Sequence, residues 1–172
     1  MTDALTNLAN RKAFDEKLEA LCAEQDLHGG TMSLAIVDID MFKRFNDTWG
    51  HQTGDQVLRY VASAISRMAA HPRLAARYGG EEFAIAFPAD SSDEVELALE
   101  AMRADIASRA LRRRSTNDDL GIVTISAGVA HRHQLESPLQ LMERADAALY
   151  VSKRSGRNRI SSAQNILSET AA

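Results

Sequence analysis

Two groups of carboxylates in this sequence stand next to features that suit catalysis or metal binding. Residues 77–83, RYGGEEF, place Glu81 and Glu82 directly after two glycines and between two apolar segments. Asp38 and Asp40 lie at the end of an apolar run that begins at residue 32. Because side chains alternate along a strand, these two aspartates are expected to point the same way. That end of a strand is where an α/β fold usually binds its ligand.

These carboxylates predict a metal site if they converge. Glu81 and Glu82 face opposite ways in a strand, so one of them could join the face of Asp38. Two or three carboxylates that share a site cannot all ionise cheaply without a cation. Hard oxygen ligands without a neighbouring His or Cys favour Mg²⁺ or Mn²⁺, which in turn favours a phosphate substrate. Taken alone, a pair such as Asp38 and Asp40 is more often simply the solvated end of a strand.

The stretch DIDMFKRFNDTWGHQTGDQVL, residues 38–58, adds groups that suit a nucleotide. Lys43 supplies positive charge for phosphates. Asn46 and Asp55 carry donors and acceptors that can read the edge of a base. The backbone N–H groups of Met41 and Phe42, where a strand turns into a helix, could cradle phosphate oxygens. This stretch therefore favours a nucleotide site over a merely solvated strand end.

The elements that must position these residues follow from hydrophobic periodicity. Helices are predicted over residues 10–26, 55–70, 93–111 and 139–155, and strands over residues 32–39, 74–78, 82–87 and 122–129. Asn10 is the expected N-cap of the first helix, Gly156 the expected cap after the last helix, and Gly79-Gly80 the expected hairpin turn. The order predicts an α/β fold in which helices flank a mixed central β-sheet that contains one antiparallel hairpin.

Several other conspicuous residues are predicted to be structural. Arg112–Arg114, which lead into STNDD, are expected in a solvated loop. His131 and His133 have no partner cysteines and are expected at the surface rather than on a metal. Cys22 is the only cysteine, so no internal disulfide can form, and it is expected to pack on the first helix.

Length and charge narrow the class of protein. The 172 residues suffice for one domain, predicted over residues 1–160, followed by a flexible tail of small and polar residues over 161–172. The net charge of −4 argues against broad binding to nucleic acid or to an anionic membrane. No apolar run reaches the length of a membrane span, and the N-terminus has no secretory pattern. A single cysteine suits a reducing cytoplasm, where we expect this domain.

The ordered motifs resemble those of the GGDEF family, the diguanylate cyclases, which make cyclic di-GMP from two GTP molecules. The resemblance covers nearly the whole chain: DALTNLANR at 3–11, DIDMFKRFNDTWGHQTGDQVL at 38–58, ARYGGEEF at 76–83, TISAGVA at 124–130 and ADAALYVSKRSGRNR at 145–159. It implies a nucleotide-cyclase-like GGDEF domain fold in which a β-hairpin carries the signature turn, here the GGEEF variant.

The resemblance also implies roles for individual residues. The implied metal ligands are Asp38, the carbonyl of Ile39, Glu81 and Glu82. Glu82 would be a catalytic carboxylate, either as a ligand of a second metal or as a general base. Arg77 would stabilise charge that develops in the transition state. The implied GTP contacts are Met41, Phe42, Lys43, Asn46, Asp55, Gly79, Gly80, Lys153 and Arg157. Gly79 and Gly80 would let GTP lie against bare backbone, where a Cβ would clash.

These roles imply a nucleotidyltransferase that works as a homodimer of domains with Mg²⁺ or Mn²⁺. Each domain would bind one GTP, and an upstream sensory domain outside this chain would bring two domains together. The alternative is a GTP-binding regulatory module without turnover; no ligand position is missing, which favours the enzyme. A related cyclase with relaxed base choice is a third possibility. Asp55 argues against it, because a carboxylate suits guanine and repels the ring nitrogen acceptor of adenine.

The sequence departs from the family pattern at one place. Many members carry an inhibitory product site, an Arg-x-x-Asp set that lies five residues before the signature turn. Here Ala70 replaces the arginine and Arg73 replaces the aspartate, the second with reversed charge. Pro72 also removes a backbone N–H from that segment. The sequence therefore predicts that no inhibitory site for cyclic di-GMP exists here.

Overall fold

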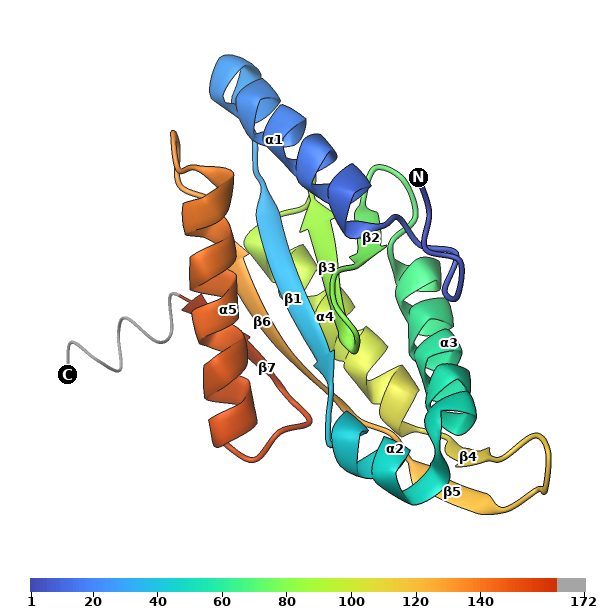
Figure 1. Cartoon of the computed structure of the whole chain (residues 1–172). Coiled ribbons are helices and arrows are strands. Elements are labelled where there is room, and N and C mark those ends of the chain that lie inside the picture. Colours follow the sequence, from blue (N-terminus) through green and yellow to red (C-terminus); the bar gives the residue numbers. More distant parts are fainter. Residues whose placement is uncertain (164–172) are drawn as a thin grey trace.

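The computed structural model describes residues 1–163. Its helices are α1 (Arg11–His28), α2 (Phe42–Trp49), α3 (His51–Met68), α4 (Ser92–Ala107) and α5 (Pro138–Arg154). The strands of the main sheet are β1 (Ser33–Ile39), β2 (Leu74–Arg77), β3 (Glu82–Phe87), β6 (Ile125–His131) and β7 (Ile160–Ser162). A separate hairpin pairs β4 (Ala110–Arg112) with β5 (Asp119–Ile122). Figure 1 shows this arrangement.

The five-stranded sheet has the order β2-β3-β1-β6-β7, which places β1 at its centre. All seven residues of β1 are buried, as its continuous apolar run predicts. β1 pairs antiparallel with both β3 and β6, β2 pairs antiparallel with β3, and β7 lies parallel to β6. The predicted mixed sheet with an antiparallel hairpin is therefore confirmed.

Helices cover both faces of this sheet, so the fold has three layers (Figure 1). α1 and α5 pack on the face that carries Leu34 and Ile36. α3 and α4 pack on the opposite face, which carries Ala35 and Val37. Full burial of a large aliphatic side chain contributes about 1.5–3 kcal/mol. The two apolar layers thus hold the strand ends, and the polar residues on them, in fixed positions.

The helix ends follow local signals in the sequence. Asn10 caps α1 as predicted, since its side chain accepts a hydrogen bond from the backbone of Ala13 at 2.9 Å. Ser91 and Ser137 start α4 and α5 with reciprocal capping boxes. Gly156 follows the C-cap of α5 with a φ of +115°, which suits the predicted capping role of a glycine.

Three predicted boundaries are wrong. The predicted helix over 55–70 begins earlier, at His51, and a separate short helix, α2, precedes it. The predicted helix over 93–111 ends at Ala107, because Ala110–Arg112 forms strand β4 instead. The arginine run therefore leads through a hairpin rather than a plain loop. The strand predicted over 122–129 is β6, which is shifted to Ile125–His131.

Two further expectations also need correction. His131 is buried rather than at the surface, because it belongs to strand β6, which pairs with the central strand β1. Its Nδ1 lies 2.7 Å from Ser33 Oγ on β1. Ser161 and Ser162 belong to β7 rather than to the predicted tail, since β7 pairs with β6 and Ser152 Oγ donates to Ser161 Oγ at 2.7 Å. The rest of that predicted tail, residues 164–172, lies outside the described residues. No helix within residues 1–163 combines the length and the apolar character that a membrane span requires.

Candidate functional site

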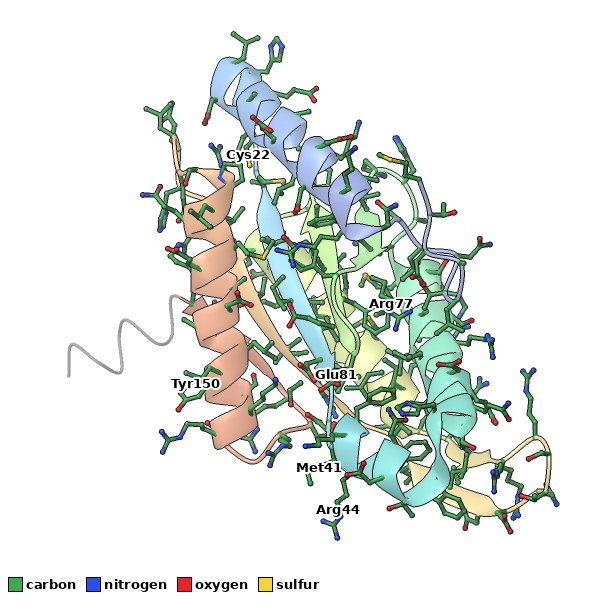
Figure 2. All side chains as sticks on the ribbon, viewed as in Figure 1. Cys22, Met41, Arg44, Arg77, Glu81 and Tyr150 are labelled. Carbon is green, nitrogen blue, oxygen red and sulfur yellow. The ribbon has the colours of Figure 1, made fainter. Side chains whose placement is uncertain are left out.

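The predicted carboxylates gather at the end of the sheet where β1 finishes and the β2–β3 hairpin turns. Figure 2 shows Glu81 at this end, between Arg77 and Met41 in that view. Asp38 stands directly opposite Glu82 in the antiparallel register of β1 and β3. Residues opposite each other on paired strands project to the same face, so Glu82 joins the face of Asp38 under α5. Glu81 comes just before β3, and its carbonyl accepts a hydrogen bond from the Ile39 N–H at 3.2 Å.

The electrostatics of this end disfavour ionised carboxylates. Burial raises the pKa of Asp38, and the charge of Asp40 raises it further against the opposing effect of Lys153. Burial also raises the pKa of Glu82, with added repulsion from Asp146 and Asp38. Burial and the charge of Asp38 raise the pKa of Glu81. Acidic groups at this site therefore outweigh their positive partners, and a bound cation would relieve the repulsion.

Lys153 is the positive partner that the structure supplies. Its Nζ donates to Asp38 Oδ2 at 2.9 Å, and Asp38 is only 7% exposed. Within residues 1–163, no three acidic, His or Cys side chains lie close enough together to form a ready-made metal site. The structure thus brings Asp38, Glu81 and Glu82 to one end of the sheet without closing them around a common point.

The spacing of Asp40 suggested a metal ligand, but its carboxylate is hydrogen-bonded within the fold. Its carboxylate accepts hydrogen bonds from Thr124 Oγ1 at 2.7 Å, from Ser126 Oγ at 2.6 Å and from the Asn158 N–H at 3.0 Å. These three donors occupy it as an anchor between β1, β6 and the loop after α5. Sequence reasoning missed the three donors, because they lie more than eighty residues away in the chain.

The start of α2 offers free backbone N–H groups. Met41 has a φ of +58°, a left-handed conformation that turns the chain sharply from β1 into α2. No side chain in the described part of the protein caps this helix. The first N–H groups of an uncapped helix carry partial positive charge and attract anions. Phe42 and Lys43 stand in this first turn, and the side chain of Lys43 is exposed.

Gly54 on α3 leaves room for Asn46 of the neighbouring helix α2 to lie beside it, next to Asp55 in the chain. Asn46 Oδ1 is buried and has no hydrogen-bond partner among the described residues. It lies against Gly54 of α3, where a Cβ would overlap it. Asp55 is the next residue of α3 and is half-buried. The sequence held a signal for this contact, because a glycine inside a helix costs about 1 kcal/mol and needs a packing or functional reason.

The signature turn presents bare backbone. The N–H groups of Tyr78 and Gly79 donate to the Glu82 carbonyl at 2.7 and 3.1 Å, which closes the hairpin. Neither Gly79 nor Gly80 has a left-handed φ. A Cβ on Gly80 would meet no atom within 4 Å, and one on Gly79 would meet only Glu82 Cβ at 3.4 Å. The fold itself therefore does not require these two glycines, and their open backbone can accept a close ligand.

The two predicted arginines, Arg77 and Arg157, differ in their contacts: the Arg77 side chain is held by other residues, whereas the Arg157 side chain is exposed. Arg77 donates to the Gly80 carbonyl at 2.9 Å and lies 3.4 Å from Asp3 Oδ2, so its guanidinium ties the turn to the N-terminal segment. Asp3 therefore helps to hold the Arg77 side chain in place, a contact that the sequence did not predict. Arg157 follows α5 with a φ of +63°, its N–H donates to the Ser152 carbonyl at 3.0 Å, and its side chain is exposed.

The segment from Ala70 to Arg73 lies at the opposite end of the sheet. The Arg73 guanidinium donates to both oxygens of Asp90 at 2.9 Å and to the Met68 carbonyl at 3.0 Å. The guanidinium also lies over the aromatic ring of Phe87, with its carbon 5.4 Å from the ring centroid. The charged group at this position is thus already engaged inside the domain.

The family model described as "Diguanylate cyclase, GGDEF domain" matches residues 1–159. Diguanylate cyclase DgcP of Pseudomonas aeruginosa is 41% identical over 93% of this chain and 23% of its own length. Diguanylate cyclase VdcA of Vibrio cholerae is 37% identical over 92% of this chain and 45% of its own length. The chain thus spans less than half the length of these curated relatives.

Solved structures show the same architecture. The GGDEF domain of DgcB from Caulobacter crescentus, in complex with c-di-GMP, has a TM-score of 0.94 at 62% identity and covers 95% of each chain. The active GGEEF domain of a diguanylate cyclase from Vibrio cholerae has a TM-score of 0.81 at 29% identity, over 89% of this chain and 96% of that one.

Proposed function

This chain belongs to the diguanylate cyclase GGDEF domain family, as its motifs predicted, and we propose that it condenses two molecules of GTP into cyclic di-GMP with release of pyrophosphate. One observation carries the proposal. Three carboxylates with raised pKa values crowd beside open glycine backbone and an uncapped helix start: the buried Asp38 and the half-buried Glu81 and Glu82. Perturbed titratable groups beside an anion-binding backbone are typical of a phosphoryl-transfer site.

The GTP would lie across this end of the sheet. Its guanine would meet Asn46 and Asp55, since the unpartnered Asn46 Oδ1 can accept from guanine and a carboxylate can accept from its ring N–H and amino group. Its phosphates would meet the N–H groups of Met41 and Phe42 at the start of α2. The proposed charge partners of the phosphates are Lys43, Lys153 and Arg157. The backbone of Gly79 and Gly80 would lie against the nucleotide.

Members of this family generally depend on a divalent metal ion. The residues at this end of the sheet fit one, because hard carboxylate oxygens that repel each other are relieved by Mg²⁺ or Mn²⁺. The proposed ligands are Asp38, the carbonyl of Ile39, Glu81 and Glu82. When bound, such an ion lowers the pKa of the attacking hydroxyl and neutralises phosphate charge.

Glu82 and Arg77 are the proposed catalytic residues. The raised pKa of Glu82 brings it closer to the range in which a carboxylate serves as a general base, although a role as ligand of a second metal uses the same oxygens. Arg77 is proposed to stabilise developing negative charge. Its hydrogen bond to the Gly80 carbonyl keeps its positive charge next to the turn where the nucleotide would lie.

One domain would hold only half of the active site. Two domains would face each other, so that each 3′-hydroxyl attacks the α-phosphorus of the other GTP. The specific activity should then rise with protein concentration, and fusion of a dimerising coiled coil to the N-terminus should raise it further.

Incubation with GTP and Mg²⁺ at several protein concentrations, followed by chromatography for cyclic di-GMP, tests the proposal directly. We expect cyclic di-GMP and pyrophosphate in both the free and the fused protein. GTP binding without any cyclic di-GMP, even in the fused protein at high concentration, would instead identify a regulatory module without turnover. A specific activity that neither concentration nor fusion changes would contradict the dimer.

A further inference from the structure

α3 and the β4–β5 hairpin lie side by side at the edge of the molecule (Figure 1). A concave site lies between them, lined by residues of both. It encloses a cavity of about 510 Å³. Five arginines line this cavity, and we call it the arginine groove: Arg59, Arg67, Arg109, Arg112 and Arg114. It shares no residue with the proposed GTP site.

Hydrogen bonds to the backbone hold the walls of the groove together. Gln56 Nε2 donates to the Arg112 carbonyl at 2.7 Å, and the Arg114 N–H donates to Gln56 Oε1 at 3.2 Å. Tyr60 joins the end of α4 to α3, because its hydroxyl donates to the Ile106 carbonyl at 2.7 Å. These contacts fix the main chain of the hairpin and leave the arginine side chains themselves available.

The charges in the groove are poorly balanced. Among these five arginines, Arg67 alone has a carboxylate partner in the described part of the chain, Asp105, at 3.2 Å. Arg112 donates to a backbone carbonyl at 3.3 Å. Within residues 1–163, the side chains of Arg59, Arg109 and Arg114 make no hydrogen bond or ion pair.

Five guanidinium groups thus face one carboxylate, in a chain whose net charge is −4. Such a concentration of one sign of charge in a concave site raises the local concentration of counter-ions.

We propose that the arginine groove binds a compact, multiply charged phosphate anion, either inorganic pyrophosphate or triphosphate or the phosphate chain of a nucleotide. A guanidinium presents a planar fork of donors that matches two phosphate oxygens at once. A cavity of this volume suits a small ligand. The overall negative charge of the domain disfavours an extended nucleic acid, whose phosphates would run beyond the groove.

Calorimetric titration with sodium triphosphate tests this site. EDTA in the buffer removes divalent ions, so the result does not depend on whether the chain makes cyclic di-GMP. The test variant is Arg59→Gln/Arg109→Gln/Arg114→Gln, whose side chains make no contact that the fold needs. We expect saturable binding of one triphosphate per domain and an affinity at least about tenfold lower in this variant.

A variant with the same loss of charge elsewhere is the control. Lys12→Gln/Lys17→Gln/Arg154→Gln removes three exposed positive charges outside the groove, and circular dichroism checks that both variants fold. We expect its affinity to stay within about twofold of the parent, because charges beyond a Debye length are largely screened. An equal loss in both variants would reduce the effect to net charge and overturn the proposal.

Further titrations separate the possible sources of the anion. Binding of ATP with the affinity of triphosphate would assign the site to the phosphate chain of nucleotides, and preference for inorganic triphosphate would assign it to the free anion. A short single-stranded oligonucleotide and vesicles with anionic lipid are the remaining arms. Tighter binding of either one than of triphosphate, or no saturable binding of triphosphate, would overturn the proposal.

Discussion

The two ends of the central sheet carry charged side chains in opposite arrangements. At the end where β1 begins, three arginines each have a close carboxylate partner. These pairs are Arg73–Asp90, Arg132–Asp26 and Arg144–Glu136. At the end where β1 finishes, acidic groups crowd together around Lys153. These groups are Asp38, Glu81, Glu82 and Asp146.

The pKa values follow this contrast. Hydrogen bonds from Arg73 lower the pKa of Asp90, and hydrogen bonds from Arg132 lower the pKa of Asp26. Burial raises the pKa of Glu82 and of Asp146 at the other end. Paired charges favour the folded state when ionised, whereas crowded like charges disfavour it. Crowded like charges at a defined point are typical of a ligand-binding or catalytic site, and the following experiments test that difference.

Glu82→Gln should separate activity from stability most sharply. Loss of the carboxylate should lower the rate of cyclic di-GMP formation by about 10²–10⁴-fold, the usual contribution of a catalytic acid or base. The melting temperature should stay the same or rise, because a half-buried charge that Asp146 and Asp38 repel is removed. Initial rates and thermal unfolding measure the two effects.

Glu143→Gln on the exposed face of α5 is the matched control for Glu82→Gln and should change neither quantity. Full activity of Glu82→Gln would remove this end of the sheet as the catalytic site. A large drop in its melting temperature would show that the Glu82 carboxylate stabilises the fold, as the paired charges at the other end of the sheet do.

Asp55→Ala should weaken GTP binding by about 1–3 kcal/mol, or roughly 5- to 150-fold, because the polar edge of guanine loses its acceptor. Gly54→Ala should act in the same direction, since its Cβ would displace Asn46 Oδ1. ATP binding should change little in both variants. Parallel calorimetric titrations with GTP and ATP measure the difference, and an equal loss for both nucleotides would disprove base recognition by this pair.

Asp90→Asn should cost stability rather than activity. The pair with Arg73 is partly exposed, so we expect a loss of roughly 1 kcal/mol in the free energy of unfolding near neutral pH. The pKa of Asp90 is lowered in the folded state, so its contribution is present above the unfolded pKa and is lost as the pH falls through the folded pKa. Urea unfolding should therefore show a difference near pH 7 that disappears once the pH falls below the lowered folded-state pKa of Asp90. A difference that persists at low pH would show that packing, not charge, is responsible.

Arg73→Ala should leave the binding of cyclic di-GMP unchanged, because Ala70 and Arg73 replace the arginine and aspartate of the family's inhibitory site. The same variant should be less stable, since Asp90 loses its partner. Calorimetric titration with cyclic di-GMP in the absence of GTP measures the first effect. Micromolar or tighter binding that Arg73→Ala abolishes would show that this end of the sheet also serves a ligand.

Prediction from the sequence succeeded where local patterns were strong and failed where they were weak. The apolar run of β1 and the Gly-Gly hairpin were predictable, because burial on both faces and a tight turn leave clear signals. The β4–β5 hairpin was missed, since its strands are only three and four residues long and none of their residues is buried. β7 was missed because three residues hold no periodicity, and their pairing with β6 supplies the structure.

The sequence by itself determined the family, the order of the main elements and the residues that we propose for the site, because these depend on residue types and on spacings within short segments. Only the tertiary structure decided which charges have partners. Lys153 reaches Asp38 from 115 residues away, and the register of β1 and β3 places Glu82 rather than Glu81 directly opposite Asp38. Such contacts depend on how strands and helices pack against one another, and packing joins residues whose separation in the chain carries no local signal.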